Sequence, residues 1–329
     1  MKYAKQEKLA LFAANAQAIK KEFTWQDAMT KRLAALLYAL ESKTVDCSAV
    51  RECHNLIKSN TGAFSAFRGN MSLCIAAMLS LCENREEQFS NTLFVYSLLK
   101  SEKLRASDYL AVAAYQIAAN APKERHSQAV DSTRAFYAGM KTKHWFHTGK
   151  DDYIYAAMLG LSGINADTGA ERIEKLYKRL KPEFWSGNSV QALSQILVLG
   201  NKSDEAVQHI LSLRDTLRSK KIRLDKMYTL PALGVLALLP VEGDVLAQDI
   251  LEAQTSLRAQ KGFGAFSVTS QELLLYAAAI ISSSYAENTD NSLITASVST
   301  SIASIIIAQQ TAIIAAAASS GAAATAASS

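Results

Sequence analysis

The sequence predicts an all-α fold: a helical-hairpin repeat array of about seven hairpins, forming an α/α superhelix or solenoid, with a closed α/α toroid as a variant. Three observations lead to this prediction. The 329 residues include only 4 Pro and 14 Gly, so breaks between regular elements are few. An apolar helical pattern recurs about every 40 residues, and charged amphipathic segments lie between its copies. Hydrophobic residues make up 49% of the chain, which is enough to bury a sizeable core.

Seven apolar segments carry a small residue at the same position. They are RLAALLYA from Arg32, CIAAMLSL from Cys74, AVAAYQIA from Ala111, IYAAMLGL from Ile154, VQALSQIL from Val190, LPALGVLA from Leu230 and LYAAAIIS from Leu275. The shared small residues are Ala34, Ala76, Ala113, Ala156, Ala192, Ala232 and Ala277. A helix that is apolar nearly all round must be covered by neighbouring helices, and alanine permits their close approach.

Charged amphipathic helices separate these apolar segments. We expect them at Glu86 to Lys100, Gln128 to Lys141, Thr168 to Lys181, Asp204 to Lys220 and Val245 to Lys261. Each buries one stripe only, so it covers the apolar helix of its own hairpin. A single irregular helical bundle with a chance repeat is the alternative interpretation.

The predicted domain organisation is a single all-helical repeat domain over residues 1–318, followed by a low-complexity tail over 319–329. An N-terminal cap helix is expected at 1–23, and it is favoured over a signal peptide because the apolar run there is short. An uncharged C-terminal helix is expected at 292–318. Its apolar length also permits a tail anchor, but polar residues interrupt it and no basic residue follows, which favours a helix lying against the last hairpin.

The net charge of +5 is modest, and basic and acidic residues are interspersed, so nucleic-acid binding is not indicated. The four cysteines lack CxxC spacing and are interpreted as small buried hydrophobes of a cytoplasmic protein. The sequence contains no GxSxG, HExxH or GxxxxGK motif and no glycine-rich nucleotide fingerprint. No cofactor is therefore expected, and catalytic residues remain unknown.

Loops that lead from a charged helix to the next apolar helix all emerge at one edge of a stacked array. Polar residues in these loops can therefore converge, and Gln191 and Gln195, four apart in an apolar helix, share a face and need partners. The predicted binding set at this edge combines charged and amide side chains. It consists of Arg68, Asn70, Asp151, Asp152, Asn188, Gln191, Gln195 and Asp225. Helix capping and hydrogen bonds between loops are the structural alternative.

A metal site is not predicted, although His144 and His147 precede Asp151 and Asp152. The intervening Trp145 and Phe146 suggest that this segment packs as a hydrophobic turn, and a metal site needs a further ligand set. The GFGAF segment that begins at Gly262 is likewise interpreted as a flexible turn with buried aromatic side chains.

The loop-to-helix junctions resemble a known family. They read FRGNMSLCIAAML from Phe67, TGKDDYIYAAMLGLS from Thr148, NSVQALSQILVLG from Asn188 and RLDKMYTLPALGVLALL from Arg223. The family is the bacterial domain-of-unknown-function family numbered four thousand and three, which has about this length. The resemblance implies a bacterial, intracellular protein and carries over no activity, cofactor or catalytic residue.

The favoured function is an interaction module that binds an unidentified protein or peptide, by analogy with other helical-repeat proteins. One alternative is an enzyme or small-molecule binder with a site at the charged loop edge. A second alternative is a tail-anchored protein that displays the array at the cytoplasmic face of a membrane, although membrane attachment is not favoured.

Overall fold

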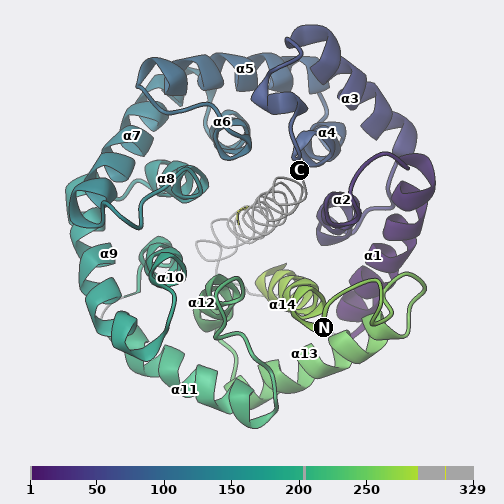
Figure 1. Ribbon diagram of the computed structural model, residues 1–329. Helices are drawn as coiled ribbons and strands as arrows, with labels where there is room; N and C mark the ends of the chain where they lie inside the picture. Colours follow the sequence, from purple (N-terminus) through teal and green to yellow (C-terminus); the bar gives the residue numbers. More distant parts are fainter. Residues whose placement is uncertain (1, 203–204, 288–307, 309–329) are drawn as a thin grey trace, which may run out of the picture.

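The computed structural model describes residues 2–202, 205–287 and 308. These residues form fourteen α-helices and three short 3-10 helices, and no strand occurs among them. The predicted all-α class is therefore confirmed. The helices alternate along the chain between an inner and an outer ring, so that each pair of consecutive helices forms one hairpin (Figure 1).

The inner ring is made of the seven predicted apolar segments. Its helices are α2 (Ala28–Leu40), α4 (Ser72–Ser80), α6 (Asp108–Asn120), α8 (Asp152–Leu161), α10 (Gly187–Leu199), α12 (Leu230–Leu238) and α14 (Ser270–Glu287). All seven shared alanines are buried, as predicted. The inner helices approach each other closely and leave little room for larger side chains. At Gly234 of α12, for example, even an added Cβ would lie 2.7 Å from Leu193 Cδ1 of α10.

The outer ring contains the charged helices. They are α1 (Lys2–Glu22), α3 (Cys47–Asn60), α5 (Arg85–Ser101), α7 (His126–Lys143), α9 (Ala166–Leu180), α11 (Ala206–Ser219) and α13 (Gly243–Arg258). The 3-10 helices η1 (Ala66–Arg68), η2 (Lys123–Arg125) and η3 (Lys181–Glu183) lie in loops. Each outer helix buries one stripe, which in α9 includes Ile173, Leu176 and Leu180. Sequence patterning located five of these helices directly and did not identify α3.

The array is closed. Helix α1 packs along α2 and also contacts α13 and α14, so the first and last hairpins meet (Figure 1). We call this junction the seam. The toroid variant, with its ends joined, is thus the form that the array takes, because an open array would leave the apolar faces of the terminal hairpins in water.

Aromatic and charged contacts hold the seam together. The Phe12 ring of α1 lies 5.0 Å from the Phe263 ring and 5.0 Å from the Tyr276 ring, in edge-to-face geometry. Lys5 pairs with Asp249 of α13 at 2.6 Å. Lys8, only 1% exposed, pairs with Glu287 at 2.8 Å and also donates to a carbonyl at the end of α2. Apart from the bond between Lys8 and the α2 carbonyl, these contacts join residues that are more than 240 positions apart in the sequence.

The two predicted C-terminal segments, the uncharged helix at 292–318 and the tail at 319–329, lie outside the described residues except for Ala308. Ala308 is buried and belongs to the main apolar cluster. The tail-anchor alternative depends on the same segment. None of the helices in the described part of the chain has the length and hydrophobicity needed to cross a membrane.

We predict that replacing Ala76 with leucine destabilises the protein by about 1–3 kcal/mol, because the inner helices leave no space for the added carbons. The free energy of unfolding from denaturant titration measures this effect. Leucine at the exposed Ala14 of α1 is the matched control and should change stability little. Equal effects at the two positions would contradict close packing of the inner ring.

Candidate functional site

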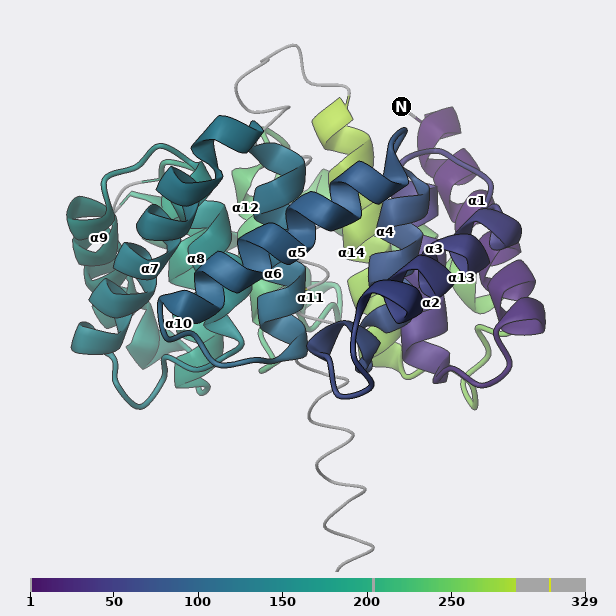
Figure 2. The same cartoon turned by 90° about the horizontal axis from the view of Figure 1, so that it is seen from above.

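The loops that lead from each outer helix to the next inner helix lie together at one edge of the ring, the lower edge in Figure 2. We call this edge the loop rim. It consists of residues 23–27, 61–71, 102–107, 144–151, 181–186, 220–229 and 259–269. Six of the predicted site residues lie in these loops or in the first turns of the inner helices that follow them, whereas Gln191 and Gln195 lie further along α10.

A buried hydrogen-bond network centres on Asp152 in the first turn of α8. Its Oδ1 accepts hydrogen bonds from Gln195 Nε2 at 2.7 Å and from Gln191 Nε2 at 3.0 Å, both from α10. Its Oδ2 accepts from the Gly149 backbone N–H at 2.9 Å. Gln191 Nε2 also lies 3.1 Å from Thr148 Oγ1. The network thus ties the 144–151 loop and α8 to α10.

The surroundings make the Asp152 carboxyl less acidic than usual. Burial raises its pKa to about 7, and the neighbouring Asp151 adds to this rise, while the three hydrogen bonds act in the opposite direction. Burial also raises the pKa of the Asp151 carboxyl. The pKa values of Tyr155 and Tyr109 are raised by burial first and then by these carboxylates. These carboxyl and hydroxyl groups therefore keep their protons to a higher pH than they would in water.

Two amide oxygens in this network lack a partner among the described residues. Gln191 and Gln195 are fully buried, and in the described part of the chain neither Oε1 atom has a hydrogen-bond partner. An unpaired buried acceptor costs about 1–3 kcal/mol. Both amides present Nε2 to Asp152, so a protonated Asp152 donates its O–H to one of these oxygens only when that side-chain amide turns over.

The 144–151 loop also contacts the first turn of α10 through His147. Its Nδ1 lies 3.0 Å from Oδ1 of Asn188, in the first turn of α10. The ring of His147 packs against Gly187, where an added Cβ would lie 2.6 Å from it. Asn188 therefore connects neighbouring hairpins at the rim.

The residues considered as metal ligands are engaged separately. His144 contacts the Glu174 carboxylate and stacks near Tyr177, with ring centroids 4.1 Å apart. His147 contacts Asn188, whereas Asp152 binds the two glutamine amides. Across the described residues, no three His, Cys, Asp or Glu side chains are grouped so that they could hold a metal ion.

Arg68 and Asn70 do not join the Asp152 network. Arg68 Nε lies 3.2 Å from Thr61 Oγ1, and its guanidinium donates to backbone carbonyls that follow α3. The positive charge of Arg68 therefore stabilises the C-terminal end of α3. The side chain of Asn70 is exposed, and its backbone carbonyl accepts a hydrogen bond from Thr30.

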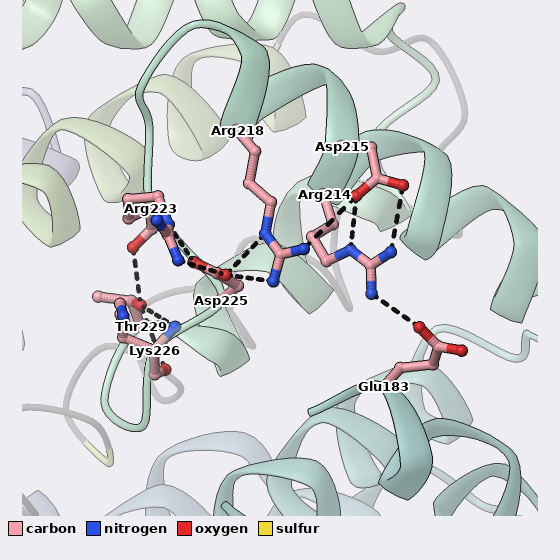
Figure 3. A network of polar contacts seen from close by, with 8 residues as sticks. All are labelled: Glu183, Arg214, Asp215, Arg218, Arg223, Asp225, Lys226 and Thr229. Carbon is pink, nitrogen blue, oxygen red and sulfur yellow. Dashed lines mark hydrogen bonds and ion pairs between the residues drawn. The ribbon is translucent and has the colours of Figure 1, made fainter. Parts of the chain in front are cut away.

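Asp225 lies in a different cluster of charges, in the 220–229 loop (Figure 3). Arg218 Nε lies 2.7 Å from its Oδ2, and Arg223 Nε lies 3.0 Å from its Oδ1. Burial favours the neutral acid, but the hydrogen bonds from the two guanidinium groups outweigh it and lower the pKa of Asp225. The same figure shows Arg214 paired with Asp215 and Glu183. Asp225 is thus held as a paired anion within its own loop.

Exposed aromatic side chains are the feature of the rim that sequence analysis missed. Trp145 and Phe146 are 64% and 86% exposed, so their interpretation as a packed hydrophobic turn was wrong. In the GFGAF segment Phe263 is buried, as predicted, but Phe266 is fully exposed. Trp25, Phe64 and Trp185, each in a different rim loop, are also almost fully exposed. Helical periodicity carries no signal for these residues because they lie outside the helices.

The fold and the rim together define a class of protein: a closed α/α ring of hairpins with polar and aromatic loops gathered at one edge. Residues 15–311 match the family described as protein of unknown function (DUF4003), and the chain belongs to this family. The resemblance found in the loop-to-helix junctions is therefore confirmed. No curated protein and no solved structure matches the chain.

We predict that Asp152→Asn makes the stability of the protein less dependent on pH. The unfolded chain loses the Asp152 proton near pH 4, whereas the folded chain loses it near pH 7. Stability contributed by the bound proton is complete below pH 4 and is lost as the pH rises through 7. Between pH 5 and 8 the wild type should lose roughly 2 kcal/mol more than the variant.

Denaturant unfolding at both pH values measures this difference. Asp131→Asn, on the exposed face of α7, is the control and should behave as the wild type. Identical pH profiles for Asp152→Asn and the wild type would show that the carboxyl is not held as a buried acid.

Proposed function

We propose that this chain is a cytoplasmic interaction module that binds a protein or peptide partner through its loop rim. The supporting observation is the concentration of exposed apolar side chains there. Among the described residues nine large hydrophobic side chains are exposed, and all except Phe94 and Val245 lie in the rim loops. The seven on the rim are Trp25, Phe64, Trp145, Phe146, Trp185, Met227 and Phe266.

Exposure of so many aromatic rings at one edge is unfavourable unless a partner covers them. Burying one such side chain contributes about 1.5–3 kcal/mol. Tryptophan and other aromatic residues are enriched among the side chains that dominate binding energy at protein interfaces. Closure of the array removes the open concave face that solenoids use for binding, which leaves the rim as the surface available for a partner.

The strongest part of this surface is formed by two neighbouring loops. Trp145 and Phe146 pack edge to face, with ring centroids 4.6 Å apart. Trp185 lies in the next rim loop, and the contact between His147 and Asn188 joins the 144–151 loop to the start of α10, which follows the loop of Trp185. The Asp152 network lies beneath them and fixes the 144–151 loop to α10. A surface held in place before binding loses less conformational entropy when it binds.

The rim is also rich in positive charge, which indicates the chemistry of the partner. Every outer helix ends at this edge, and each has a lysine or arginine in its last turn. These side chains complement the negative ends of the helix dipoles, and they also surround the exposed aromatic residues with cations. A partner with acidic residues around apolar pockets would match this pattern.

The enzyme alternative receives less support than it did from the sequence. Its proposed site included Arg68 and Asp225, and both side chains are engaged within their own loops. Asp152 remains a buried acid with a raised pKa, which a small-molecule site could use, but its immediate contacts are the glutamine amides and a backbone N–H.

We predict that a Trp25→Ser, Trp145→Ser, Trp185→Ser variant binds the partner at least about tenfold more weakly than the wild type, with little change in thermal stability. Quantitative affinity purification identifies wild-type partners, and titration with each purified partner then gives the dissociation constant. A Phe94→Ser, Val245→Ser variant, which removes exposed apolar side chains away from the rim, should bind as the wild type. Unchanged affinity in the tryptophan variant would contradict the proposal.

A further inference from the structure

A small basic pocket lies at the seam, on the same edge as the loop rim. Its volume is about 220 Å³. The residues that matter for its chemistry are Lys20 of α1, Ala28, Lys31 and Arg32 of α2, and Phe263 and Ser267 of the 259–269 loop. The pocket is therefore shared between the first hairpin and the loop that precedes the last inner helix.

The lining of this pocket carries three positive charges and no acidic side chain. Arg32 is held in place because its Nε lies 2.8 Å from Glu272 Oε1, which also accepts a hydrogen bond from Tyr276. Neither Lys20 nor Lys31 has a carboxylate within 4 Å in the described part of the chain. Two cations therefore line a concave space without a counter-charge from the described residues.

The acidic residues closest in sequence to these lysines are already engaged. Glu22 pairs with Arg51 of α3. Asp27 caps α2, where its Oδ1 accepts from the Thr30 backbone N–H at 2.8 Å. Ala28, the first residue of α2, lines the pocket, but the Asp27 carboxylate already caps the positive end of this 13-residue helix, so the attraction for an anion comes from the lysine side chains. A concave site lined by one sign of charge concentrates ligands of the opposite sign.

The loop wall of the pocket is fixed to α1. Gly262 adopts a φ of +87°, which favours glycine, and an added Cβ would lie 2.7 Å from Gln17 Nε2. Gln17 Nε2 donates to the Lys261 carbonyl at 2.5 Å, and Phe263 packs on Phe12. The three walls thus keep their spacing without a ligand, as a preformed binding site requires.

We propose that this seam pocket binds a small ligand that carries a phosphate group, with Lys20 and Lys31 as its ion-pair partners and Arg32 as an oriented cation. Several converging cations match a dianionic group better than a single carboxylate. The volume is below the range typical of drug-sized ligands, which limits the bound part to a small group. The proposal is independent of partner binding at the aromatic residues.

Binding at this position links the first hairpin to the last. A ligand that contacts α1, α2 and the 259–269 loop stabilises the closed ring, because the three walls are together only when the ring is closed. Occupancy of the pocket should therefore raise the melting temperature as well as produce saturable binding.

The test titrates the full-length protein with inorganic phosphate and with glycerol phosphate at constant ionic strength, by calorimetry and by thermal unfolding. Vesicles that contain phosphatidic acid, compared with vesicles of phosphatidylcholine alone, distinguish a lipid headgroup from a free phosphate compound. We expect saturable binding of one phosphate group per chain in at least one arm, and at least about tenfold weaker binding by a Lys20→Gln, Lys31→Gln variant.

A Lys43→Gln, Lys123→Gln variant, which removes the same charge from the opposite edge of the ring, is the matched control and should bind as the wild type. Circular dichroism establishes that both variants are folded. Binding that is equally strong in both variants, or no saturable binding of phosphate, glycerol phosphate or phosphatidic acid vesicles, would overturn the proposal.

Discussion

Burial of the inner helices is the constraint on which the structure depends. These helices are apolar on nearly every face, and α12 is buried along its whole length. An outer helix covers only one side of its inner partner, so each inner helix needs a neighbouring hairpin on both flanks. Hairpins at the ends of an open array lack one flank, and the ring removes this deficit because the first hairpin serves as the neighbour of the last (Figure 1).

The contacts at the seam join the first and last hairpins of the repeat into a closed ring. Phe12 packs against Phe263 and Tyr276, and the buried Lys8 joins the end of α2 to Glu287 of α14. Loss of its partners would leave the Lys8 ammonium group buried without compensation, so these contacts favour one specific closure. Closure also determines which surfaces are irregular. In the closed ring these are the two edges at which the loops lie. The exposed aromatic residues gather at one of them.

The repeat could be predicted from the sequence because it is local. Ala156 and its six counterparts recur in apolar helices, and each is buried as the spacing indicates. Closure could not be predicted in the same way, because it depends on pairs such as Lys5 and Asp249, which no local pattern connects. Helix caps are local in the same sense: the Ser107 hydroxyl accepts from the Leu110 N–H at the start of α6, and the Thr269 hydroxyl accepts from the Glu272 N–H at the start of α14.

The candidate site was predicted only in part. Gln191 and Gln195 were found because two amides on one face of an apolar helix need partners, and Asp152 supplies them. Arg68 and Asp225 look equivalent to Asp152 in the sequence, but Arg68 donates to backbone carbonyls at the end of α3, and Asp225 pairs with Arg218 and Arg223. Trp145 was misinterpreted because hydrophobicity predicts burial on average, and a binding surface is the exception to that rule.

Zero-length carbodiimide crosslinking of the native protein tests closure most directly, since it joins lysines to carboxylates already in contact. In the monomer fraction the closed ring predicts links between Lys5 and Asp249 and between Lys8 and Glu287. The pair Lys178 and Glu174, one turn apart in α9, reports that the reaction worked. A link within α9 without either long-range link would show that the ends of the array do not meet.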